Sequence, residues 1–152
     1  MIEERLNAMG IEIPEAPKPL AAYIPALRTG NLVMTAGQLP MKDGKLMGEG
    51  KLGSDFSIDQ GKEFAKQCAI NCLSVIKGEI KNLDKIKRIV KLTVFVNSAD
   101  GFTAQPQVAN GASEFMVELF GDNGKHVRSA VGVNELPINA PVELEMIVEV
   151  AE

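Results

Sequence analysis

The positions of apolar and polar residues along the chain predict a short N-terminal helix followed by an extended segment. Ile2, Leu6 and Met9 recur at helical spacing. The prolines of the sequence IPEAPKP then interrupt that helix, because proline removes a backbone donor and fixes φ. We therefore expect residues 1–18 to form an N-terminal arm.

The next apolar segment predicts a β-hairpin near the N-terminus. Residues 32–39, with the sequence LVMTAGQL, have the composition of a strand. Pro40 and the turn sequence KDGK at residues 42–45 follow it, and a return strand is expected after this turn.

Two longer amphipathic helices are predicted further along the chain. Ser57 and Gln60 have the spacing of a capping box, in which each side chain satisfies a backbone N–H of the other residue. Apolar residues then recur at intervals of three or four as far as Ile80, which indicates one buried face. The same spacing predicts a second helix over residues 108–120, before a glycine-containing turn.

Three more strands are predicted in the second half of the chain, over residues 89–97, 128–133 and 141–150. One face of the first of these strands is expected to carry Val90, Leu92, Val94 and Val96, and the other face Lys91, Thr93 and Asn97. In the last strand, Val142, Leu144, Met146, Val148 and Val150 share one face, and Glu143, Glu145, Ile147 and Glu149 share the other. We expect the last two strands to form a closing hairpin.

The predicted order ββαβαββ indicates an α+β fold, in which both helices cover one face of a mixed sheet. The other face of the sheet then needs a cover, and a partner subunit would supply it. No composition shift or internal repeat divides the chain, so we expect a single domain over residues 1–152.

Composition and charge narrow the class of protein. The net charge is −4 and the pI is near 5.1, with no Trp and one Tyr. These values give neither a phosphate-binding field nor a base-stacking surface, so nucleic acid is an unlikely partner. No apolar run approaches the ~20 residues that cross a bilayer, and the first residues MIEER are acidic, so we expect a cytoplasmic protein without a membrane segment.

The residues that often bind metals or cofactors are few in this chain. Cys68 and Cys72 lie four apart in a helical pattern, where they would pack rather than form a disulfide, as suits a reducing compartment. His126 is the only histidine, which excludes a two-histidine metal site, and we interpret it as a loop or surface residue. The glycines of GEGKLG at residues 48–53 lack the helix start of a dinucleotide-binding loop. We expect no metal and no cofactor.

Arg128 and Glu143 form the strongest candidate pair for chemistry. Three carboxylates on one strand face repel one another unless water or a cation is near, and Arg128 on the neighbouring predicted strand could supply that cation. A guanidinium grips a carboxylate by two hydrogen bonds, and a glutamate can orient or deprotonate water. The pair suits either hydrolysis or simple binding of a small 2-substituted acid, and a solvated strand edge is the alternative without function.

Three separated segments resemble signatures of the Rid (YjgF) family. GNLVMTAGQLP at residues 30–40 is similar to the family segment G-N-x-x-x-(T/S)-(S/A)-G-Q-x-P, and KLTVFVNSADGF at residues 91–102 resembles its central strand and following loop. Residues 127–150 resemble the C-terminal signature, in which an arginine strand leads through Leu-Pro to a V-E-(I/L)-E strand. The resemblance extends from about residue 19 to the C-terminal strand.

The resemblance implies a chorismate-mutase-like fold of the bacillus type. It also implies a homotrimer whose sheets pack inward and whose ligand pockets lie between subunits. In the family, a pocket arginine binds the carboxylate of 2-aminoacrylate or its imine tautomer, and a glutamate helps water to attack. Arg128 matches the arginine and Glu143 the glutamate. Tyr23 resembles the pocket tyrosine, Gly37 a backbone donor, and Asn110 the asparagine that opens the second helix.

The chain departs from the family pattern at two predicted substrate-binding positions. Ala36 stands where deaminases of the family usually have serine, and Ala130 where they often have cysteine. The loop at residues 100–108 and the N-terminal arm are also longer, which indicates a divergent branch. The resemblance therefore implies a cofactor-free deaminase of small 2-imino acids, with a trimeric keto-acid-binding module as the alternative and a ribonuclease or translation inhibitor as the minor one.

Overall fold

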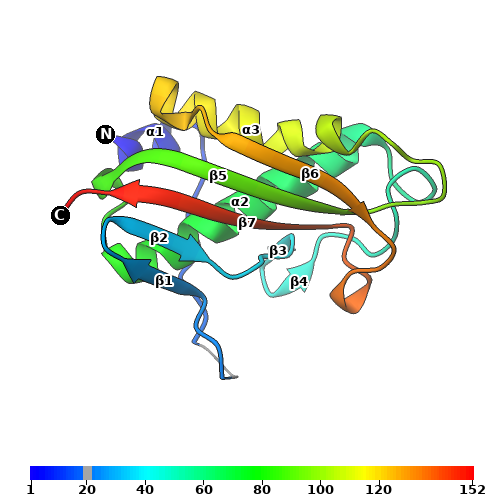
Figure 1. The fold of residues 1–152 in the computed structure, drawn as a ribbon, viewed down its shortest axis with the longest axis horizontal. Coiled ribbons are helices and arrows are strands. Elements are labelled where there is room, and N and C mark those ends of the chain that lie inside the picture. Colours follow the sequence, from blue (N-terminus) through cyan, green and yellow to red (C-terminus); the bar gives the residue numbers. More distant parts are fainter. Residues whose placement is uncertain (19–21) are drawn as a thin grey trace.

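The computed structural model describes residues 1–18 and 22–152 of the chain. Its main feature is a five-stranded sheet with the strand order β1-β2-β7-β5-β6 (Figure 1). The strands are β1 (Ala26–Thr29), β2 (Leu32–Thr35), β5 (Ile86–Asn97), β6 (Val127–Val133) and β7 (Val142–Val150). β5 and β6 run parallel and the other neighbours run antiparallel, so the sheet is mixed as predicted.

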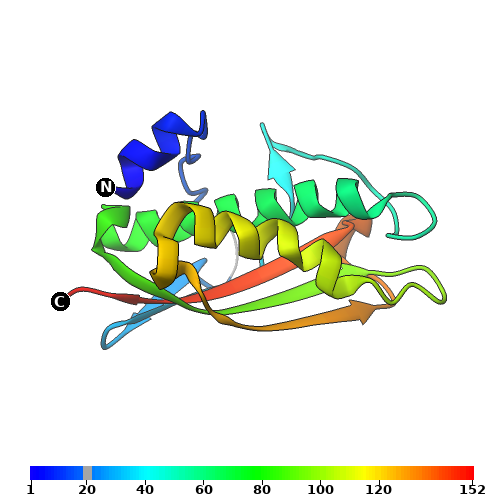
Figure 2. The same cartoon turned by 90° about the horizontal axis from the view of Figure 1, so that it is seen from above.

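The helices lie together on one face of this sheet (Figure 2). They are α1 (Ile2–Ala8), α2 (Ile58–Ile80) and α3 (Gln105–Phe120), with short 3₁₀ turns η1 (Leu83–Lys85), η2 (Gly121–Gly124) and η3 (Pro137–Asn139). The expected capping box at the start of α2 is present, because the Ser57 hydroxyl accepts from the Gln60 N–H while the Gln60 side chain accepts from the Ser57 N–H. The α+β architecture with helices on one face is therefore confirmed.

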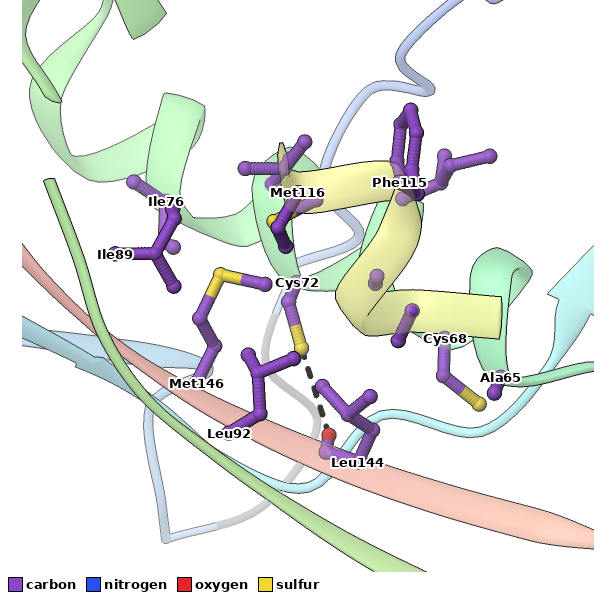
Figure 3. Packing of buried hydrophobic residues seen from close by; sticks show 14 of the residues in the cluster. Ala65, Cys68, Cys72, Ile76, Ile89, Leu92, Phe115, Met116, Leu144 and Met146 are labelled. Atoms are coloured by element: carbon purple, nitrogen blue, oxygen red, sulfur yellow. Dashed lines mark hydrogen bonds between the residues drawn. The ribbon is translucent and has the colours of Figure 1, made fainter. Parts of the chain in front are cut away.

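The core lies between the sheet and the helices (Figure 3). Cys68 and Cys72 point from α2 into this core as free, fully buried thiols. The Cys72 thiol donates to the carbonyl oxygen of Leu144 on β7 at 3.4 Å. Burial raises the pKa of Cys72 to about 12 and raises the pKa of Cys68 as well. Both cysteines therefore pack rather than bridge, as their spacing predicted.

The first hairpin differs from the prediction. β2 pairs with β1, a strand that the sequence analysis did not identify, and the two strands turn at residues 30 and 31. Gly30 has φ +59, a conformation that suits glycine in so tight a turn. The predicted turn at residues 42–45 instead joins β3 (Met41–Lys42) to β4 (Lys45–Leu46), a separate two-stranded hairpin.

The predicted closing hairpin of the last two strands is wrong. β7 lies between β2 and β5, and β6 pairs with the far side of β5. The reason is the helical crossover: α3 connects β5 to β6, and such a connection brings consecutive strands together in parallel. β6 is therefore an edge strand with α3 above it.

The faces of β5 also differ in detail from the prediction. A register shift between Ile89 and Lys91 turns Ile89 into the core and leaves Val90 partly buried. Asn97, expected on the exposed face, is fully buried because its side chain donates to the carbonyl oxygens of Gly50 and Ala140. The faces of β7 alternate as predicted, with Val142, Leu144, Met146, Val148 and Val150 buried.

One further boundary differs from the expectation. α3 begins at Gln105, so the predicted loop at residues 100–108 ends at residue 104.

Within the described residues, none of the helices combines the length and apolar character that crossing a membrane requires.

Candidate functional site

Glu143 and Gly37 are in direct contact at one end of the sheet. Glu143 lies on β7 between the buried residues Val142 and Leu144, so its side chain points to the face of the sheet that the helices leave open. A β-carbon placed on Gly37 would lie 2.7 Å from Oε1 of Glu143. Gly37 is exposed, and its N–H makes no backbone hydrogen bond among the described residues. The structure thus brings these two predicted site residues together.

The environment of Glu143 raises the pKa of its carboxyl group. Partial burial raises the pKa of Glu143, and the neighbouring charge of Glu145 raises it further. Within the described part of the chain, neither carboxylate has an ion-pair partner. A carboxylate with a raised pKa can exchange a proton with water or substrate nearer to neutral pH than an ordinary glutamate can.

A buried side chain from α2 holds the segment that carries Gly37. The amide nitrogen of Asn71 donates to the carbonyl oxygens of Leu39 and Met41, each at 2.9 Å. The same segment pairs with β7, where the backbones of Gln38 and Leu144 exchange hydrogen bonds at 2.8 and 3.0 Å. Asn71 therefore helps to hold the segment that follows Gly37, although the sequence analysis did not select it.

Arg128 lies at the other edge of the sheet, under α3. Its Nη1 donates to Oδ1 of Asn110 at 2.8 Å and to the hydroxyl of Ser113 at 3.1 Å. Both partners are neutral, and Arg128 has no carboxylate partner among the described residues. No hydrogen bond within this part of the chain uses Nε or Nη2 of Arg128. The guanidinium is therefore positioned but keeps donors for a ligand.

Asn110 and Ser113 reach Arg128 from one face of α3, where they lie three residues apart. Asn110 was expected to open this helix, but it lies in its second turn, because α3 begins at Gln105. Ser113 was not predicted. Its spacing from Asn110 is the sequence signal that could have identified it.

His126 extends this network from the loop between η2 and β6. The interpretation as a loop or surface residue is therefore right about the loop, although the side chain is partly buried. Its Nε2 lies 2.9 Å from the Ser113 hydroxyl, and its Nδ1 lies 2.6 Å from the carbonyl oxygen of Gly124. Burial lowers the pKa of His126, and the charge of Arg128 lowers it further, against the opposing effect of the Gly124 carbonyl.

Arg128 and Glu143 do not meet within one chain, so the predicted contact between neighbouring strands is wrong. β5 separates their strands: Leu92 aligns with Arg128, and Phe95 aligns with Glu143. With strands about 4.8 Å apart and about 3.3 Å per residue, roughly 14 Å separates their Cα atoms. Arg128 also points toward α3 and Glu143 toward the open face. Within one chain, Arg128 and Glu143 therefore do not share a pocket.

Of the remaining predicted residues, Ala36 adjoins Gly37 in the sequence and Ala130 lies on the same strand as Arg128. Tyr23 lies just before β1 and is 64% exposed. Ala36 follows β2, and its N–H donates to the carbonyl oxygen of Pro25 at 2.8 Å. Ala130 lies two residues after Arg128 on β6 and packs against the core. Neither alanine offers a side-chain hydrogen-bonding group at its end of the sheet.

A cavity of about 760 Å³ lies away from both groups, between the N-terminal arm, the β3–β4 hairpin and α2. Its buried polar side chains bond within the chain: Asn71 holds the segment described above, and the Ser74 hydroxyl donates to the carbonyl oxygen of Pro14 at 2.6 Å. No buried side-chain N or O atom among the described residues lacks a partner. Nothing in the cavity points to a ligand.

Comparison with known proteins adds independent information on the family. The model of the family described as "YjgF/chorismate mutase-like, putative endoribonuclease" matches residues 3–150. Protein TCP17 of Trypanosoma cruzi is 39% identical over 149 residues, which cover 97% of this chain and 93% of that protein. A 2-iminobutanoate/2-iminopropanoate deaminase of Dermatophagoides farinae is 30% identical over 138 residues, with 91% and 93% coverage.

Solved structures agree with this match. The chain superposes on the protein Atu1372 of Agrobacterium tumefaciens, described as of unknown function, with a TM-score of 0.92 and 40% identity over 99% of this chain and 92% of that one. It superposes on a putative endoribonuclease of Shewanella oneidensis with a TM-score of 0.94 and 31% identity, covering 99% of both chains.

Proposed function

We propose that this chain, which belongs to the YjgF/chorismate mutase-like family, hydrolyses small 2-imino acids to 2-keto acids and ammonia. The observation that carries the proposal is the state of Arg128. A partly buried guanidinium is held by two neutral acceptors and keeps donors for a planar anion. The carboxylate of a 2-imino acid has the shape and charge to bind there. The deaminase of Dermatophagoides farinae supports the reaction type.

Glu143 is proposed as the base in this reaction. Its carboxylate takes a proton from water while the water oxygen forms a bond to C2 of the protonated imine and the C=N π electrons move to nitrogen, which gives a 2-amino-2-hydroxy acid. Glu143 then returns the proton to the nitrogen and the C–N bond breaks with its electron pair on nitrogen. The C2 hydroxyl loses its proton to the departing ammonia as it becomes the keto group, so nitrogen leaves as ammonium and the Glu143 carboxylate is regenerated. The Gly37 N–H, next to this carboxylate, is proposed to donate to the substrate.

The proposed pocket forms between copies of the chain, because the two groups of residues lie on opposite faces of the sheet. The open face carries apolar side chains in adjacent positions. Met34 on β2 is aligned with Ile147 on β7, and Phe95 on β5 is aligned with Val131 on β6. Burial of such a face against identical copies is the expected source of stability for a symmetric oligomer. We propose a homotrimer that packs these sheets inward.

A cytoplasmic location is part of the same proposal. The two cysteines are free although they lie four residues apart, which is consistent with a reducing compartment.

The test is ammonia and keto-acid release from freshly generated 2-iminopropanoate, with and without the protein. The proposal expects acceleration above the spontaneous rate, and loss of that acceleration in Arg128→Ala. Arg28→Ala is the matched control, because Arg28 donates to the backbone carbonyls of Gly30 and Ala151 at the far edge of the sheet. Equal rates with and without the wild-type protein would refute the deaminase.

A binding module for keto acids is the second candidate. The two alanines at residues 36 and 130 favour it, because they remove side-chain groups that could polarise the substrate. Saturable keto-acid binding that needs Arg128, without ammonia release, would select this candidate. RNA cleavage stays the minor alternative, since the net charge of −4 gives it no physical support.

A further inference from the structure

His126, Ser113 and Arg128 form one continuous chain of hydrogen bonds. Nδ1 of His126 faces the Gly124 carbonyl, which can only accept, so Nδ1 carries a proton. In the neutral ring Nε2 is then an acceptor, and the Ser113 hydroxyl donates to it. The Ser113 oxygen in turn accepts from Nη1 of Arg128. Each hydrogen bond therefore has one direction, from Arg128 to Ser113, from Ser113 to His126, and from His126 to Gly124, and this set of directions requires a neutral imidazole.

Protonation of His126 would break this order. Nε2 would become a donor, and the Ser113 oxygen would face donors from both His126 and Arg128. The hydroxyl proton would have to turn away, and two positive charges would share one oxygen atom. The contact that orients the Arg128 guanidinium would weaken.

We propose that His126 is a positioning residue, which holds the anion-binding guanidinium of Arg128 through Ser113 and does so only in its neutral form. The inference rests on the proposed function, in which Arg128 binds the carboxylate of the ligand. It adds a residue to the site and predicts that ligand affinity depends on the charge of His126.

Other charged residues lie on the elements around His126, but the hydrogen bonds through Ser113 link His126 to Arg128. The charged residues on the neighbouring elements are Glu114 and Glu118 on α3, Asp122 and Lys125 at η2, Lys87, Arg88 and Lys91 on β5, and Arg128 on β6. Asp122 and Lys125 form an exposed ion pair at 3.2 Å, and Arg88 donates to the Lys125 carbonyl at 3.1 Å. Of these charges, Arg128 is the one that lowers the pKa of His126.

The first test follows His126 itself. Because it is the only histidine, its ring-proton NMR signal is assigned without ambiguity. We expect the wild-type signal to titrate below the ordinary value of 6.5, and the Arg128→Ala signal to titrate at higher pH. A signal with the same midpoint in both proteins, at the ordinary value, would overturn the proposal.

The second test measures the affinity for 2-oxobutanoate by calorimetry between about pH 5 and pH 8. Wild-type affinity should fall about 10-fold toward the acid end, as expected when one hydrogen bond to a charged group is lost. His126→Gln keeps a side-chain acceptor that does not titrate, so its affinity should follow pH less steeply. Ser113→Ala should bind more weakly at neutral pH and should also lose the His126-dependent part of the pH profile.

The outcomes distinguish failure of the proposed function from failure of the proposed role of His126. If Arg128→Ala binds 2-oxobutanoate as wild type does, the proposed function fails. If Arg128→Ala abolishes binding while His126→Gln keeps the complete wild-type pH profile, only the role of His126 fails. If wild type does not bind the probe, the NMR titration still decides whether His126 is coupled to Arg128.

Discussion

The β-carbon that Gly37 lacks would lie 2.7 Å from Oε1 of Glu143 and 2.9 Å from its carboxyl carbon. The φ angle of Gly37 is not in the left-handed region, so the position needs glycine for space and not for backbone freedom. The carboxylate is therefore held against the backbone of the segment that follows β2.

Gly37→Ala should displace the Glu143 carboxylate and reduce deamination while the fold remains. A displacement of about 1 Å at a reacting group can cost about 100-fold in rate, and we expect kcat/KM to fall by that order. Gly78→Ala is the matched control, because its added carbon meets Ala16 at an ordinary 3.4 Å. Wild-type kcat/KM in Gly37→Ala would argue against Glu143 as the base.

Glu145→Gln should move the acid limb of the pH–rate profile to lower pH. Glu145 is one of the two causes that raise the pKa of Glu143, and its removal should lower that pKa. The proposed base must be ionised, so kcat/KM rises with pH through the pKa of Glu143 and should begin to rise earlier in the variant. Glu149→Gln, on the same face of β7, should leave the profile unchanged, and an equal shift in both variants would contradict the assignment.

The elements that the sequence predicted well are those whose signals are local. The capping box at Ser57 and Gln60 begins α2 as expected, because both hydrogen bonds form within four residues. The alternation along β7 identified its buried face, because the period of a strand needs no knowledge of its neighbours.

The contacts of Arg128 could not be predicted in the same way. Strand pairing is non-local, and β7 enters the sheet between β2 and β5, which separates Arg128 from Glu143. The sequence RSAVGV also does not indicate which side of β6 faces α3. One side carries Arg, Ala and Gly and the other carries Ser, Val and Val, so neither has the composition of a clear core face. Family resemblance named both residues, and the structure adds that one chain does not bring them together.

Asn71→Ala should destabilise the protein and loosen the segment that carries Gly37. The variant leaves the carbonyl oxygens of Leu39 and Met41 without their shared donor, which costs about 1–3 kcal/mol when such groups are buried. We expect a lower free energy of unfolding in urea. Gln67→Ala is the control, because Gln67 donates to Asn71 and not to the two carbonyls, and an equal loss there would show that the segment is held by other contacts.

The two thiols should react slowly with a thiol reagent at about pH 8 in the folded protein and rapidly in denaturant. Cys68 and Cys72 are fully buried, and the pKa of Cys72 is raised to about 12, so both the reactive thiolate and access to it are lacking. Fast labelling of either residue under native conditions would contradict a purely structural role.

Mixing two inactive variants tests whether the site is shared between copies. Arg128→Ala keeps Glu143, and Glu143→Gln keeps Arg128, so each variant alone lacks one residue in every pocket. If the pocket combines Arg128 of one copy with Glu143 of the next, a mixed oligomer contains some pockets with both residues intact. Random assembly from equal amounts should make about one quarter of the pockets complete, because each of the two copies must be the right variant with a chance of one half.

The measurement is deamination by the two variants after they are unfolded together and refolded, compared with each variant refolded alone. Recovery to about one quarter of wild-type activity would show that two chains build the pocket, as we propose from the separation of the two residues on opposite faces of the sheet. A double variant that carries both substitutions on one chain, mixed with wild type, is the control. It should leave about one quarter of the wild-type activity as well, whereas a site within one chain would leave about one half. Two inactive variants that stay inactive on mixing, while this control retains one half, would place the complete site within a single chain.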